Sequence, residues 1–89
     1  MVDLTKYNVD NDDIAFLQQI EDACVNEQNE VQLEYDGYSF VLEPHGKIIK
    51  VYSNGNDIAE YETFDNFLLN HKIAGKTVID IIKDIEYGE

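Results

Sequence analysis

The sequence predicts a single α+β domain with an N-terminal helix, a three- or four-stranded antiparallel meander and two C-terminal helices. Apolar residues recur at helical spacing near the N-terminus, alternate with polar residues in the middle, and return to helical spacing near the C-terminus. A chain of 89 residues can bury one modest core, so we expect residues 1–89 to form one domain.

The first predicted element is an amphipathic helix. Asp10 or Asn11 can cap its N-terminus, and Asp12 and Asp13 in its first turn suit the helix dipole. The helix should end near Asn26, because the residues that follow offer no apolar side chain to the core. Its apolar stripe consists of Ile14, Leu17, Ile20 and Cys24.

A β-hairpin is predicted next. Apolar and polar residues alternate from Val31, and the dipeptide Asp36-Gly37 favours a two-residue type I′ turn. Such a turn places Tyr35 opposite Tyr38 and gathers six apolar side chains on one face of the ribbon. These six are Val31, Leu33, Tyr35, Tyr38, Phe40 and Leu42.

Two further strands, residues 47–53 and 57–62, should complete the meander after loops at 43–46 and 54–56. These loops would place four more residues on the core face, namely Ile49, Val51, Ala59 and Tyr61. The other face would carry Val41, Ile48, Tyr52 and Ile58 among polar residues. We favour the interpretation that helices cover parts of both faces. The alternative is an exposed apolar patch rimmed by carboxylates, which would mark an interface.

Two helices are predicted at the C-terminus. Thr63 can cap a short helix that runs to about His71, and Gly75 then interrupts the helical pattern. Thr77 with Asp80 forms a capping-box-like start for a second helix. The two apolar stripes are Phe64, Phe67 and Leu68, and then Val78, Ile81, Ile82 and Ile85.

The charge of the chain restricts its partners. Nineteen acidic residues against six lysines give a net charge of −13, which opposes binding to nucleic-acid phosphates and to anionic membranes. The chain has no arginine and so lacks the planar fork that grips phosphate. We therefore expect a basic protein surface as the partner, with no direct contact to nucleic acid or membrane.

No catalytic, metal or cofactor site is predicted. Cys24 is the only cysteine and fits the role of a small buried hydrophobe. His45 and His71 have no second ligand at metal-binding spacing. Gly75-Lys76-Thr77 lacks the rest of a phosphate-binding loop, and residues 10–13 lack the glycine of a calcium loop. We expect a non-enzymatic protein that needs no cofactor and stays in a reducing cytoplasm.

Two functions from different classes fit these features. The first is a protein-binding inhibitor, of the kind that phages and mobile elements encode, whose acidic surface blocks the nucleic-acid-binding site of a basic enzyme. The alternative is a structural or accessory domain that self-associates as a homodimer. Acidic residues clustered around the outer sheet face would favour the first function. The candidate partner-binding residues are Asp12, Asp13, Glu34, Asp36, Glu43, Tyr52, Glu60 and Glu62.

Overall fold

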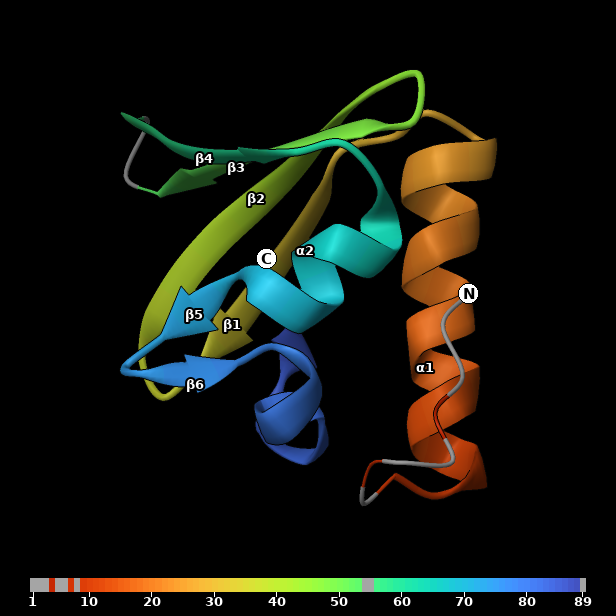
Figure 1. Cartoon of the computed structure of the whole chain (residues 1–89), viewed down its shortest axis with the longest axis vertical. Helices are drawn as coiled ribbons and strands as arrows, with labels where there is room; N and C mark the ends of the chain where they lie inside the picture. Colours follow the sequence, from red (N-terminus) through yellow and green to blue (C-terminus); the bar gives the residue numbers. More distant parts are fainter. Residues whose placement is uncertain (1–3, 5–6, 8, 54–55, 89) are drawn as a thin grey trace.

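The computed structural model describes residue 4, residue 7, residues 9–53 and residues 56–88. Within these residues the chain forms a five-stranded antiparallel sheet in the order β4-β3-β2-β1-β7, with one long helix beside it (Figure 1). The strands of the sheet are β1 (Val31–Tyr35), β2 (Tyr38–His45), β3 (Ile48–Ser53), β4 (Asn56–Tyr61) and β7 (Glu86–Tyr87). The remaining elements are α1 (Asn11–Glu21), η2 (Asp22–Asn26), α2 (Phe64–Asn70), β5 (Lys72–Ile73), β6 (Lys76–Thr77) and η3 (Ile79–Asp84).

Helix α1 begins and ends as the sequence predicts. The Asp10 side chain accepts a hydrogen bond from the Asp13 backbone N–H at 2.9 Å, and the Asp13 side chain accepts one from the Asp10 N–H at 3.0 Å. This reciprocal capping box satisfies two donors at the helix N-terminus. The π-helical turn η2 continues α1, so helical structure extends to Asn26.

The predicted hairpin of β1 and β2 is confirmed. Tyr35 pairs with Tyr38, and the register continues through Leu33 opposite Phe40. Asp36 and Gly37 have φ angles of 48° and 81°. Positive φ at both central residues is the requirement of a type I′ turn, which Asp-Gly meets at low steric cost.

The predicted loop at 43–46 is wrong. Strand β2 continues to His45, and the turn to β3 consists of Gly46 and Lys47, with Gly46 at φ 66°. Pro44 is tolerated in β2 because β1 pairs with β2 only as far as Leu42, so Pro44 lies beyond its neighbour on that side. The observed pairing of β2 with β3 differs from the predicted pairing by an even number of residues, so the same residues face the core as predicted. On β3 the buried residues of the core face are Ile49 and Val51.

Strand β4 pairs with β3 as predicted at one end and departs from the prediction at the other. Val51 lies opposite Ala59, but a bulge at Ile58 then shifts the register and places Tyr52 opposite Asp57. The bulge removes Ile58 from the outer sheet face, so the predicted position of this residue is wrong. Residues 54 and 55 of the predicted loop lie outside the described residues.

The predicted pair of C-terminal helices is wrong, and the predicted fold class is wrong with it. Helix α2 does form, and the Thr63 hydroxyl caps it by accepting from the Asn66 N–H at 3.1 Å. The chain then makes the β5–β6 hairpin, whose turn residues Ala74 and Gly75 have φ angles of 54° and 81°. The 3-10 helix η3 follows, and β7 pairs with β1 as an additional strand of the sheet.

The composition of residues 78–85 explains this difference. Five β-branched side chains lower the helix propensity of the segment, and all five are buried. An α-helix would place Ile79 at the edge of the apolar stripe, about 60° around the axis from Ile82, whereas a 3-10 helix brings residues i and i+3 into line, and η3 buries both. The predicted Thr77–Asp80 contact persists as a side-chain hydrogen bond of 2.7 Å without starting an α-helix. The five buried residues are Val78, Ile79, Ile81, Ile82 and Ile85.

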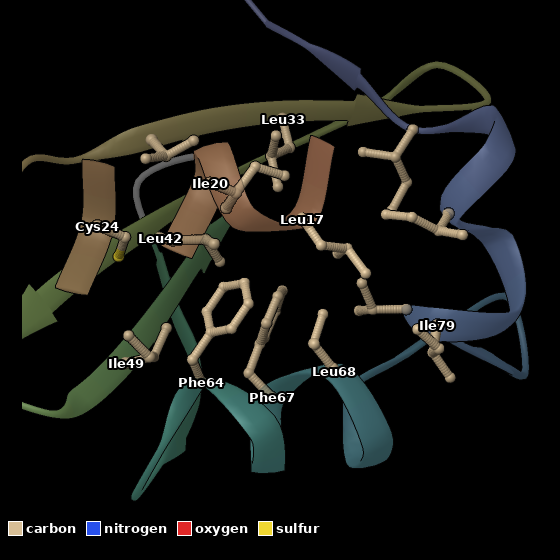
Figure 2. Close-up of a cluster of buried hydrophobic side chains, with 14 of the residues drawn as sticks. Leu17, Ile20, Cys24, Leu33, Leu42, Ile49, Phe64, Phe67, Leu68 and Ile79 are labelled. Atoms are coloured by element: carbon tan, nitrogen blue, oxygen red, sulfur yellow. The ribbon is translucent and has the colours of Figure 1, made fainter. Parts of the chain in front are cut away.

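The hydrophobic core lies between one face of the sheet and the helices. Figure 2 shows side chains of α1, α2, η3 and the sheet directed into the same space, among them Leu17, Leu42 and Phe67. On the core face of β1, β2 and β3 the residues away from the ends of the strands are buried, whereas Tyr35 and Tyr38 beside the hairpin turn are half-buried and exposed. The alternate residues are half-buried or exposed. The interpretation that helices cover parts of both faces is therefore wrong, because the described elements cover only one.

Candidate protein-binding face

The sheet face opposite the core, here called the open face, is the most distinctive surface of the described chain. Side chains alternate between the two faces of a strand, so the pairing registers assign each residue to one face. All residues of the open face are half-buried or exposed. They are Gln32, Glu34, Ser39, Val41, Glu43, His45, Ile48, Lys50, Tyr52, Asp57, Glu60 and Glu86.

A row of three residues crosses the middle of the open face. Gln32 pairs with Val41, and Val41 pairs with Tyr52, which brings an amide, an aliphatic group and an aromatic ring side by side. The Gln32 side chain donates to the Ser39 hydroxyl at 2.9 Å, which holds the amide in place. A shallow depression of about 350 Å³ lies over this row and extends to Glu30.

Carboxylates surround this row. Glu34 on β1 lies directly opposite Glu86 on β7, a pairing of like charges that destabilises a sheet. The only lysine of the face, Lys50, is half-buried and lies 3.9 Å from Glu60, which is exposed to solvent, so this ion pair is weak. The local charge is therefore strongly negative. The carboxylates of the face and its rim are Glu30, Glu34, Glu43, Asp57, Glu60 and Glu86.

The structure brings together four of the eight predicted site residues. Glu34, Glu43, Tyr52 and Glu60 share the open face, and Glu43 also lies 2.6 Å from the His45 ring nitrogen Nε2. The other four lie elsewhere. Asp12 and Asp13 lie in the first turn of α1, Asp36 in the hairpin turn, and Glu62 after the end of β4.

Asp13 serves the fold rather than a free surface. Its carboxylate is 13% exposed and accepts a hydrogen bond from Lys83 Nζ at 2.6 Å, and Asp10 accepts from the same nitrogen at 3.2 Å. The Asp13 backbone N–H and then Lys83 lower the pKa of Asp10, and the hydrogen bonds to Asp13 and Asp10 raise the pKa of Lys83. This cluster ties η3 to the start of α1.

Sequence reasoning missed Glu30 and Glu86 as members of the face. Glu30 continues the polar alternation of β1 and could have been found by extending the strand pattern one step back. Glu86 was assigned to the end of a helix. The Gly88 N–H donates to the Gln32 carbonyl at 2.8 Å, so residues 86–88 lie along β1. Because this contact joins residues far apart in the sequence, no local pattern predicts it.

The other candidate chemistries find no support in this geometry. Cys24 is buried in the core, and burial raises the pKa of its thiol to about 11, which suppresses the nucleophilic thiolate. Gly75 occupies a hairpin turn that leads into β6, and Asp10 caps a helix instead of lining a calcium loop. In the described residues no group of three or more His, Cys, Asp or Glu side chains could hold a metal ion.

The fold and the open face define a small acidic α+β domain with one uncovered sheet face. Comparison with known proteins finds no family model, no curated protein and no solved structure that matches this chain. None of the helices in the described ranges is long and apolar enough to cross a membrane. The functional argument therefore rests on the chemistry of the open face.

Proposed function

We propose that this protein is a non-enzymatic binding domain whose open face engages a basic surface on a partner protein. The observation that carries the proposal is the arrangement of six carboxylates and one lysine around Val41 and Tyr52 on an uncovered sheet face. A partly apolar centre with an aromatic residue and a charged rim is typical of protein interfaces. The carboxylates add complementarity to lysine and arginine side chains.

The partner that fits best is a groove rich in lysine and arginine. Such grooves in nucleic-acid enzymes hold phosphates, and a carboxylate-rich face can occupy them in place of the nucleic acid. The net charge of −13 favours this mode, since the domain itself repels phosphate. Inhibition of a nucleic-acid enzyme, as practised by small proteins of phages and mobile elements, is the specific form of this proposal.

Self-association through the open face is the second candidate. Ile48 is 39% exposed there, and exposed apolar side chains favour an interface. A two-fold interface would, however, place the carboxylates of one copy against those of the other. This repulsion ranks the homodimer below a basic partner, and light scattering at low and high salt distinguishes the two, because only the homodimer doubles the mass of the isolated protein.

Two triple variants with equal charge changes test the proposal. The open-face variant combines Glu34→Gln, Glu60→Gln and Glu86→Gln. The control combines Asp12→Asn, Glu27→Gln and Asp84→Asn, three acids away from that face. The probe is a fluorescent peptide rich in lysine and arginine. Exposed ion pairs contribute about 0.5 kcal/mol each, so the open-face variant should bind about tenfold more weakly.

Three results bear on the proposal. A weakened open-face variant, an unchanged control and an affinity that falls steeply with salt would support it. The same peptide loses affinity equally for both triple variants if overall charge alone drives binding, and this outcome overturns the proposal. An affinity that does not respond to salt also overturns it.

A further inference from the structure

Strand β4 is an edge of the five-stranded sheet. Its pairing partner is β3 on one side, and no strand in the described part of the chain lies on the other. An edge strand offers backbone N–H and C=O groups to another chain, and proteins protect such edges with bulges and charges. The bulge at Ile58 and the carboxylates of Asp57 and Glu60 are protections of this kind. They repel a second copy of this acidic chain but attract a basic one.

A groove of about 120 Å³ lies beside this edge, between the ends of the strands and the β5–β6 hairpin. Figure 1 shows that hairpin next to the sheet, below the ends of β3 and β4. Ile58 lines the groove and is 52% exposed, and Tyr38 and Ile73 contribute further apolar surface. Cavities of about 150 Å³ hold a benzene ring, so this groove has the size for one branched or aromatic side chain.

His71 provides a polar group in the wall of the groove. The residue is 6% exposed, and its Nδ1 lies 2.9 Å from the Tyr61 hydroxyl. Burial lowers the pKa of His71, so the ring is neutral near pH 7. Either the Tyr61 hydroxyl donates to Nδ1 or Nδ1–H donates to the hydroxyl, and the tautomer of the neutral ring follows from the direction of this bond.

The second ring nitrogen of His71, Nε2, bonds to no group in the described chain. No described side-chain nitrogen or oxygen is both fully buried and unpartnered, so Nε2 keeps some contact with solvent. Because His71 lines the groove, an occupant that excludes water from Nε2 has to supply a hydrogen-bond partner.

We propose that an extended basic segment of the partner adds to β4 as a further strand and inserts one apolar side chain into the groove beside Ile58. A polar group of the same segment forms a hydrogen bond with His71 Nε2. Because side chains alternate along a strand, the neighbouring lysine or arginine of the segment lies over the open face near Glu60. The inference rests on the proposed function and adds that the partner binds through an extended strand.

Synthetic seven-residue peptides with alternating lysine and leucine test this inference. Three versions are compared: the plain peptide, one with alternate backbone nitrogens methylated so that one edge cannot donate, and one with the same composition in scrambled order. Hydrogen exchange of the β4 amides is followed by NMR. We expect the plain peptide to protect these amides at least tenfold and to bind at least tenfold more tightly than either other version.

Variants of the groove provide the second readout. Ile58→Ser should weaken binding of the plain peptide about tenfold, whereas Ala15→Ser, a substitution by the same residue at an exposed position of α1 away from the groove and the open face, should have little effect. Salt-sensitive binding with unprotected β4 amides and no effect of methylation would overturn strand addition while leaving the proposed function standing. Absence of salt-sensitive binding to any of the three peptides would overturn both.

Discussion

Truncation of Ile79 to alanine tests the conformation of the C-terminal segment. In the α-helix that the sequence predicts, Ile79 would lie about 100° around the axis from Val78 and about 60° from Ile82, at the edge of the apolar stripe. In η3 its side chain is 3% exposed, equal to that of Ile82. Truncation of a buried isoleucine costs about 2–5 kcal/mol, so Ile79→Ala and Ile82→Ala should each lower the free energy of unfolding by about 3 kcal/mol.

Urea unfolding followed by far-ultraviolet circular dichroism measures this difference. With a slope of about 1.5 kcal/mol per molar urea, a loss of about 3 kcal/mol lowers the midpoint by about 2 M. The exposed substitution Asp84→Ala on the same element is the control. Ile79→Val, expected to cost about 1 kcal/mol, replaces the alanine variant if the latter does not fold. A neutral Ile79→Ala beside a costly Ile82→Ala would refute the equal burial of the two residues in η3.

Three further predictions follow from single contacts. Gln28→Ala removes the pair of hydrogen bonds, 2.8 and 3.0 Å, between the Gln28 amide and the Gly46 backbone, and should lower the free energy of unfolding by about 1–2 kcal/mol; an unchanged urea midpoint would contradict this. Burial holds the pKa of His71 below its ordinary value of 6.5, so as the pH falls through 6.5 the unfolded chain gains a proton that the folded chain does not, and stability decreases until the folded pKa is reached. Measured between about pH 7.5 and 5.5, His71→Gln should reduce this slope, and an unchanged slope would contradict the effect of burial on His71. Native Cys24, with its thiol pKa of about 11, should react with a thiol reagent at neutral pH about a hundredfold more slowly than in urea, and equal rates would show that the thiol is accessible.

Four of the eight candidate partner-binding residues could be placed on one sheet face from the sequence. The period-two alternation of a strand assigns its residues to the two faces without knowledge of the fold. Asp36-Gly37 determines the register of β1 and β2, and this places Glu34 on the outer face. Glu43 and Tyr52 follow by alternation through the next turn, although that turn was misplaced. Asp12 and Asp13 were included only because every acid in so charged a chain resembles a surface group.

By itself the sequence determined what depends on near neighbours: the capping box at Asp10, the end of α1, the first hairpin and the Thr63 cap of α2. In each of these the stabilising partner lies within a few residues, so its signal is present in the local sequence.

The tertiary structure alone decided the path after Thr77 and the uncovered state of the outer face. The segment that contains Ile79 and Ile82 satisfies a helical stripe almost as well as a 3-10 turn, and burial against the sheet selects the second. Strand β7 exists because β1 offers an unpaired edge to Tyr87, a partner far away in sequence. Residue periodicity reports that a face is apolar, and only packing determines which element covers it.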